Sequence, residues 1–109
     1  MTKRSFLGEL EELVLLAALQ LEGDAYGASI LRVLDQHTGR DVPRGSVYAA
    51  IDRLESKGYL SLHAGEATPG RRGRPRRMVI VTQQGLDAIR LTHHVRDQLR
   101  AGLEARLQS

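Results

Sequence analysis

The sequence has 109 residues, no cysteine and a formal net charge of +3. Its length fits one small domain, and the absence of cysteine excludes disulfide scaffolds, thiolate metal sites and cysteine nucleophiles and favours a reducing cytoplasm. Residues 66–77 contain five arginines and one glutamate, so this segment alone carries a charge of +4 and the rest of the chain sums to −1. Such a local basic segment predicts a polyanionic partner.

The first predicted helix starts in an acidic segment and ends at Gly23. Its apolar residues recur at helical spacing, and they are Leu10, Leu13, Val14, Ala17, Ala18 and Leu21. Glu9, Glu11 and Glu12 lie in its first turns, where the helix dipole favours anions, and they interrupt the apolar run that a secretion signal needs. Because further leucines widen the apolar surface, this helix is either the central core helix or also contacts a second subunit.

The segment between Asp24 and Gly39 is predicted to form a second, amphipathic helix. Asp24 is expected to cap its N-terminus, and Gly39 is expected to end it. Its expected inner face consists of Tyr26, Ile30, Val33, Leu34 and His37. The short connection after Gly39 leads into a third helix, so the three helices follow the order of a helix-turn-helix unit.

The third predicted helix lies between Pro43 and Gly58 and has two different faces. Pro43 suits a first turn, where its missing N–H is not needed, and Gly58 suits a left-handed position after the last turn. The predicted inner face is Val47, Ile51 and Leu54, and the predicted outer face is Ser46, Ala49, Ala50, Arg53 and Lys57. A face that is small in its middle and basic along its length fits a DNA major groove.

Several side chains of this third helix are candidates for DNA contact, and some have an alternative role. The Tyr48 hydroxyl donates a hydrogen bond to a phosphate, or the Tyr48 ring packs half-buried beside the first helix. Arg44 reaches a base edge or only the backbone. Arg53 binds DNA or pairs with Asp52, Glu55 or another surface carboxylate. Ser46 and the first amides of the helix can hold a phosphate. The candidates are Arg44, Gly45, Ser46, Tyr48, Ala49, Arg53 and Lys57.

Two β-strands are predicted at residues 59–64 and 78–82, joined by a loop rich in Gly, Pro and Arg. A helix-turn-helix followed by such a hairpin is a winged helix, with the loop as a cationic wing tip. Residues 72–76 read RGRPR, the core of an AT-hook, whose arginines enter a narrow A·T minor groove. The alternative is a solvated loop, but the position on a wing favours groove or phosphate contact. The candidates here are Arg71, Arg72, Arg74, Arg76 and Arg77.

A long C-terminal helix is predicted to begin after Thr82, its expected N-cap. It carries a ridge of apolar residues spaced four apart, which are Leu91, Val95, Leu99, Leu103 and Leu107. Its predicted length of about two dozen residues corresponds to about 36 Å, more than the preceding domain can cover. A second copy of the chain is the expected partner of this ridge. We therefore divide the chain into a winged-helix DNA-binding domain, residues 1–82, and a dimerisation helix, residues 83–109.

These motifs together resemble the PadR family of bacterial transcriptional regulators. The specific part lies within residues 45–60 and reads GSVY, RLE and KGYL, while GRPRR at 73–77 and the Thr82-x-x-Gly85 pattern extend the resemblance over about residues 6–107. It implies a dimeric winged helix whose third helix reads an operator and whose C-terminal helix pairs the subunits, acting as a repressor. Met78 and Val79 depart from the family's pattern, which commonly has aromatic residues after the wing arginines.

An enzyme and an RNA- or protein-binding module are the alternative classes. His93 and Asp97 share a helix face but offer at most two metal ligands, and no phosphate loop or catalytic triad is present, so we expect no enzyme, metal or cofactor. A basic wing could bind RNA, but the chain lacks exposed aromatic residues for base stacking. The sequence thus predicts a mainly α protein with a small β-hairpin, a cytoplasmic homodimer that binds double-stranded DNA at an inverted repeat. It predicts no membrane association, and no motif identifies a small-molecule effector.

Overall fold

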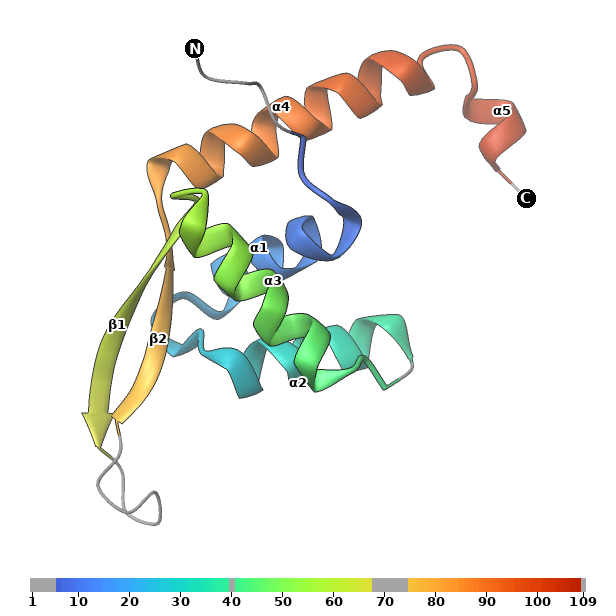
Figure 1. Ribbon diagram of the computed structural model, residues 1–109. Helices are drawn as coiled ribbons and strands as arrows, with labels where there is room; N and C mark the ends of the chain where they lie inside the picture. Colours follow the sequence, from blue (N-terminus) through green and yellow to red (C-terminus); the bar gives the residue numbers. More distant parts are fainter. Residues whose placement is uncertain (1–5, 40, 68–74, 109) are drawn as a thin grey trace.

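The computed structural model describes residues 6–39, 41–67 and 75–108. The elements in chain order are α1 (Glu9–Leu21), the 3₁₀ turn η1 (Glu22–Asp24), α2 (Gly27–Thr38), α3 (Arg44–Ser56), β1 (Leu60–Ala67), β2 (Pro75–Val81), α4 (Gln83–Arg100) and α5 (Glu104–Leu107). In Figure 1 the helices α1, α2 and α3 form one unit beside the β1–β2 hairpin, and α4 runs across its top. This is the winged helix-turn-helix arrangement that the sequence predicts.

Three of the predicted helix boundaries are formed by the residues expected there. Gly39 ends α2 in the left-handed conformation, with φ of 70°. Gly58 follows α3 with φ of 80°, which glycine adopts without steric cost. Thr82 caps α4, because its hydroxyl oxygen accepts a hydrogen bond from the Gly85 amide at 3.1 Å.

The predicted start of α2 is wrong by two residues. Asp24 does not cap this helix, because it belongs to the 3₁₀ turn that follows α1. Tyr26 occupies the N-cap position, and the Ser29 hydroxyl accepts a hydrogen bond from the Tyr26 amide at 2.9 Å. The Ser29 hydroxyl in turn donates to the Asp24 carbonyl at 2.7 Å, so the turn and the first residues of α2 are joined through this side chain.

The core lies where α1 packs against α2, α3 and the hairpin. Its largest fully buried side chains are Val14, Leu15, Ile30, Val47 and Leu54. The predicted inner face of α3 is confirmed, but Ala50, predicted on the outer face, is fully buried. Ala50 is three residues after Val47 and four before Leu54, and these spacings place it on the inner face of the helix.

The hairpin is longer than predicted and is attached to the helical unit along β2. The antiparallel register runs from Leu60 opposite Val81 to positions beyond the predicted 59–64 strand, with an irregularity after Ala64. On its other edge, β2 is bound to the segment before α2, since the Val79 amide donates to the carbonyl of the buried Ala25 at 2.8 Å. The wing therefore has a fixed base close to the helix-turn-helix.

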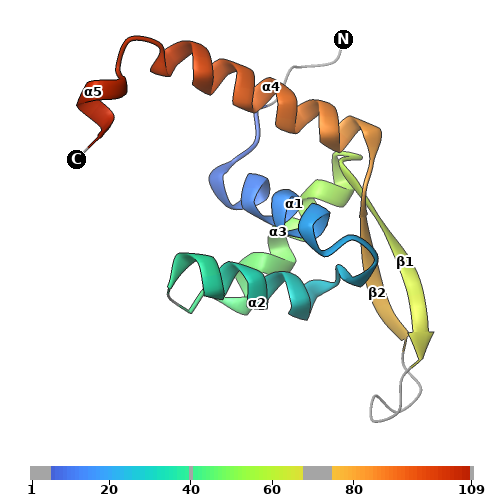
Figure 2. The same cartoon turned by 180° about the vertical axis from the view of Figure 1, so that it is seen from behind.

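The C-terminal helix is shorter than predicted. A continuous helix of about two dozen residues is expected from the sequence, but α4 ends at Arg100, after 18 residues or about 27 Å. The chain then turns at Gly102, which has φ of 84°, before the short helix α5. Figures 1 and 2 both show the second half of α4 and α5 projecting beyond the rest of the domain. No helix in the described part of the chain is long and apolar enough to cross a membrane.

The first part of α4 is anchored on α1 by a buried carboxylate. Glu12 is only 4% exposed, and its oxygens lie 2.7 Å from Arg96 Nη2 and 2.7 Å from His93 Nε2. Ile89, in the first half of α4, belongs to the common core. His93, considered above with Asp97 as a metal ligand, is therefore directed at α1.

Candidate nucleic-acid interface

The exposed face of α3 begins at its first turn. Arg44, Gly45, Ser46 and Ala49 are all exposed. Pro43 occupies the N-cap position, and its side chain has no acceptor for the first amides of the helix. Unpaired amides and the positive end of the helix dipole make such a terminus an anion site. This half of α3 thus has the composition and the exposure that a phosphate or a base edge requires.

Tyr48 lies against the start of α2. Its side chain is 41% exposed, and a Cβ atom added to Gly27 would overlap its ring. Glycine at the first position of α2 therefore makes room for the aromatic ring. The ring is thus partly covered, and the neighbour that the structure gives it is Gly27 of α2. Arg44 extends along the same face, with its guanidinium carbon 5.9 Å from the Tyr48 ring centroid.

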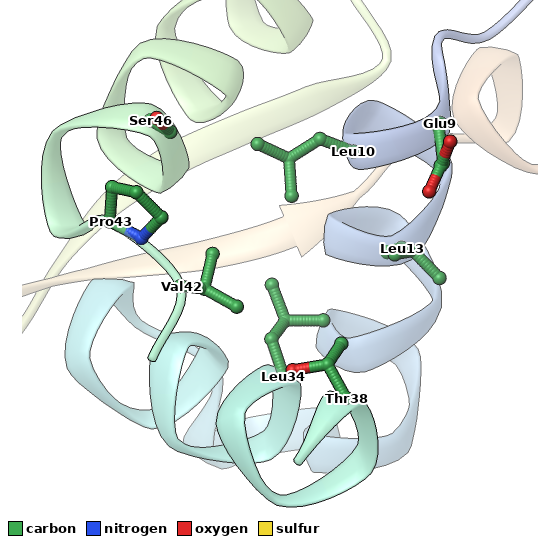
Figure 3. A pocket seen from close by; sticks show the side chains of 8 residues that line it. All are labelled: Glu9, Leu10, Leu13, Leu34, Thr38, Val42, Pro43 and Ser46. Atoms are coloured by element: carbon green, nitrogen blue, oxygen red, sulfur yellow. The ribbon is translucent and has the colours of Figure 1, made fainter. Parts of the chain in front are cut away.

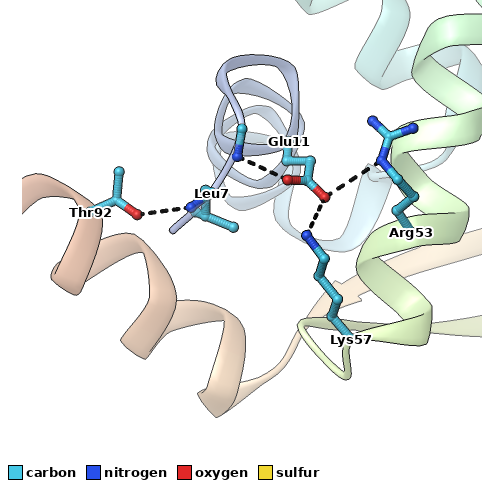
Figure 4. A network of polar contacts seen from close by, with 6 residues as sticks. Leu7, Glu11, Arg53, Lys57 and Thr92 are labelled. Atoms are coloured by element: carbon cyan, nitrogen blue, oxygen red, sulfur yellow. Dashed lines mark hydrogen bonds and ion pairs between the residues drawn. The ribbon is translucent and has the colours of Figure 1, made fainter. Parts of the chain in front are cut away.

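The two basic residues at the C-terminal end of α3 are directed at α1. Lys57 Nζ lies 2.8 Å and Arg53 Nε 3.6 Å from the same oxygen of Glu11 (Figure 4). The other oxygen of Glu11 accepts a hydrogen bond from the Gly8 amide at 2.9 Å. The alternative considered for Arg53, pairing with Asp52, Glu55 or another surface carboxylate, is met only in part: Arg53 pairs with a carboxylate, but this is the buried Glu11 of α1.

Glu11 is a functional candidate that the sequence analysis did not identify. Burial opposes its ionisation, but hydrogen bonds from Lys57 and the Gly8 amide, with the charges of Lys57 and Arg53, outweigh burial and hold the pKa of Glu11 below its ordinary value. A signal was present in the sequence, because Glu11 lies three and four residues before Val14 and Leu15 and so shares the apolar face of α1.

The wing arginines fall into three groups. The guanidinium of Arg76 stacks over the Tyr26 ring, 4.3 Å from its centroid, and its Nε has no hydrogen-bond partner in the part of the chain that the structure describes. Arg77 is exposed on β2. The other predicted wing contacts, Arg71, Arg72 and Arg74, lie outside the described residues. Arg76 therefore joins the wing to the start of α2, while Arg77 faces solvent.

A cavity of about 300 Å³ lies behind the first turn of α3 (Figure 3). Side chains of α1, of the end of α2 and of the connection to α3 surround it, and most of them are apolar. They are Glu9, Leu10, Leu13, Leu34, Thr38, Val42, Pro43 and Ser46. The first turn of α3 therefore borders open space, whereas its later turns pack against buried side chains.

The apolar residues predicted to mediate dimerisation are only partly covered by the protomer. Leu99 is 72% exposed, and Leu103 and Leu107 are also exposed, while Leu91 and Val95 are partly buried. Because the chain turns at residues 101–103, Leu103 and Leu107 do not continue the straight ridge along α4. The predicted ridge is therefore divided into a helical part and a part beyond the turn.

A family model described as the transcriptional regulator PadR-like family matches residues 15–91. The chain belongs to this family. As a PadR-like protein it is a transcriptional regulator, a class that acts by binding DNA, and it is not an enzyme. The family resemblance stated from the sequence is thereby confirmed.

Solved structures support the PadR-like fold. A transcriptional regulator from Clostridium thermocellum is similar over 91% of this chain and 90% of its own, with 20% identity and a TM-score of 0.71. A PadR-like regulator from Bacillus cereus is similar over 92% of both chains, with 19% identity and a TM-score of 0.69. A PadR family regulator from Eggerthella lenta is 26% identical, over 89% of this chain and 81% of its own, with a TM-score of 0.65. No curated protein matches the chain.

Proposed function

We propose that this protein is a cytoplasmic, homodimeric repressor that binds an inverted-repeat operator in double-stranded DNA. In each half-site α3 enters the major groove with its N-terminal half, and the wing arginines contact the adjoining backbone or minor groove. The two subunits associate through the exposed apolar residues of α4 and α5. Occupation of the operator excludes other proteins from the promoter.

The observation that carries this proposal is the exposed N-terminal half of α3. Arg44 supplies donors for a guanine edge or a phosphate, Ser46 and the first amides can hold a phosphate, and Ala49 leaves room for close approach. The base of the wing is held next to the start of α2, because Arg76 of β2 stacks on the Tyr26 ring just before that helix. The base of the wing is thus attached beside the helix-turn-helix, so α3 and the wing arginines can contact neighbouring grooves of one duplex.

Selection of bound duplexes from a random pool, with excess RNA as competitor, tests the proposed function. We expect enrichment of an inverted repeat with half-site centres about 10 base pairs, or a multiple of that, apart. Enrichment of a single asymmetric site would contradict the dimeric mode of binding. Loss of all duplex binding to the RNA competitor would favour an RNA partner instead.

Variants of α3 then test which residues read the sequence. Arg44→Ala should lower the ratio of operator affinity to scrambled-duplex affinity, because a base contact is worth about 1–3 kcal/mol of discrimination. Arg90→Ala is the matched control, since Arg90 is an exposed arginine of α4 whose nearby carboxylate is the equally exposed Asp87. A ratio that falls equally in both variants would show that Arg44 makes no base contact.

A further inference from the structure

The basic residues of the recognition helix are not equally available. Between the start of α3 and its C-cap the chain has three cations, Arg44, Arg53 and Lys57. Arg44 lies on the outer face beside Tyr48, whereas Arg53 and Lys57 converge on one oxygen of Glu11. The side chain of Glu11 is only 7% exposed, so this is a largely buried carboxylate with two partly exposed cationic partners.

We propose that Glu11 is a specificity-determining residue that keeps Arg53 and Lys57 from binding DNA phosphates. With both cations held on α1, nonspecific attraction between α3 and DNA depends on Arg44 and the helix N-terminus alone. This inference rests on the proposed function, because it concerns the balance between operator and nonspecific binding. It differs from the expectation from sequence that Arg53 and Lys57 are themselves DNA contacts.

The physical reason is the cost of leaving a buried carboxylate without partners. Each cation that moved from Glu11 to a phosphate would remove one of the two charges that compensate an ionised side chain in a site that water hardly reaches, which is unfavourable. Phosphate contacts are also independent of sequence, so each one strengthens binding to all DNA alike. Because Glu11 holds Arg53 and Lys57 away from phosphates, it lowers the affinity for every duplex. Discrimination between operator and other DNA then depends on the first turns of α3.

Removal of the negative charge should therefore release both cations. Glu11→Gln keeps the size of the side chain and an oxygen that can accept a hydrogen bond from the Gly8 amide. The neutral glutamine no longer attracts Arg53 and Lys57. Arg53 is already 54% exposed and held at 3.6 Å, so it is free to turn toward solvent once the charge is lost. Glu9→Gln is the matched control, because Glu9 is an exposed glutamate of the same first turn.

The test is a salt titration of binding to a scrambled duplex and to a duplex selected from the random pool. For Glu11→Gln we expect the slope of log K against log salt to steepen by up to about 1.8 per protomer, about 0.9 for each released cation. Affinity for the scrambled duplex should rise at least about tenfold at about 50 mM salt, and the operator-to-scrambled ratio should fall. Glu9→Gln should leave both slopes as in the wild type.

Further variants separate masking of charge from a purely structural role. Adding Arg53→Ala and Lys57→Ala to Glu11→Gln should return the slope to the wild-type value, which a role in folding alone would not do. A Glu11→Gln slope equal to that of Glu9→Gln overturns the inference. Should Glu11→Gln fail to fold in circular dichroism, Lys57→Met decides, because it retains the Arg53 pair. It should leave the slope unchanged, and a flattening by about 0.9 would show that Lys57 already contacts phosphate.

The wild type distinguishes failure of this inference from failure of the proposed function. If the unmodified protein binds no duplex in either titration, the proposed function is wrong and the inference falls with it. If the wild type binds the selected duplex but the variants do not differ as described, only the role assigned to Glu11 is wrong.

Discussion

Leu99→Ala should weaken the dimer without unfolding the protomer. Leu99 is 72% exposed in the protomer, so a second subunit can cover most of its surface. Complete burial of a leucine side chain contributes about 1.5–3 kcal/mol, so burial of this fraction contributes about 1–2 kcal/mol. A two-fold dimer contains the contact twice. The expected loss is up to about 2–4 kcal/mol, which corresponds to an increase in the dissociation constant of about 30-fold to about 1000-fold.

Sedimentation equilibrium over a range of protein concentrations measures this dissociation constant. Gln98→Ala is the control, because Gln98 is the exposed preceding residue of the same helix, and leucine and glutamine have similar helix propensities. Far-ultraviolet circular dichroism should be unchanged in both, since neither side chain belongs to the core. A wild-type protein that is monomeric at tens of micromolar, or equal association of the two variants, would refute the proposed interface.

Three further changes concern the fold and its ion pairs. Gly85→Ala should cost about 3 kcal/mol in urea denaturation, because the added Cβ would overlap a backbone carbonyl oxygen, whereas Gly45→Ala, which meets open space, should cost nothing. A double-mutant cycle of Arg76→Ala and Tyr26→Leu should give a coupling of about 0.5–2 kcal/mol, and zero coupling would exclude the cation–π contact. Folding lowers the pKa of Glu11, so the ionised Glu11 should stabilise the folded protein relative to the Glu11→Gln variant, and this stabilisation should be complete above about pH 5. The difference in unfolding free energy should shrink as the pH falls toward 3, and a constant difference would contradict the ion pairs.

The elements that depend on local sequence could be predicted closely. Helical spacing located α1, and the glycines after α2 and α3 ended those helices as expected, because a left-handed residue at that position is a local property of the chain. Thr82 likewise caps α4 through an atom three residues away. The two strands could be placed because an alternating run at 59–64 and a β-branched run at 78–82 are each typical of a strand.

The errors arise where competing local signals are close in energy. The leucine ridge at a spacing of four continues through Leu103 and Leu107, and this pattern favours an unbroken helix. A glycine inside a helix costs only about 1 kcal/mol, so Gly102 alone does not decide whether the helix continues. In the structure the chain turns at Gly102, and the ridge is divided. Ala50 was misplaced for a different reason, since alanine is compatible with both faces of a helix.

The contacts of Arg53 and Lys57 could not be predicted from the sequence. Their partner lies 42 and 46 positions earlier in the chain, and its identity depends on the angle at which α3 crosses α1. Only the general alternative of a carboxylate partner followed from the composition. A charge on the apolar face of α1 is the clue that would have pointed to Glu11 as a buried partner.

Glu11 and Glu12 are successive residues of α1, yet they hold different helices. Glu11 contacts the end of α3, and Glu12 contacts His93 and Arg96 of α4. A rotation or shift of α1 therefore changes both attachments together. If pairing of two subunits alters the position of α4, it alters the free energy of DNA binding as well, and linkage requires the effect to be reciprocal. We therefore expect operator DNA to tighten subunit association by the same factor by which association tightens binding to the operator.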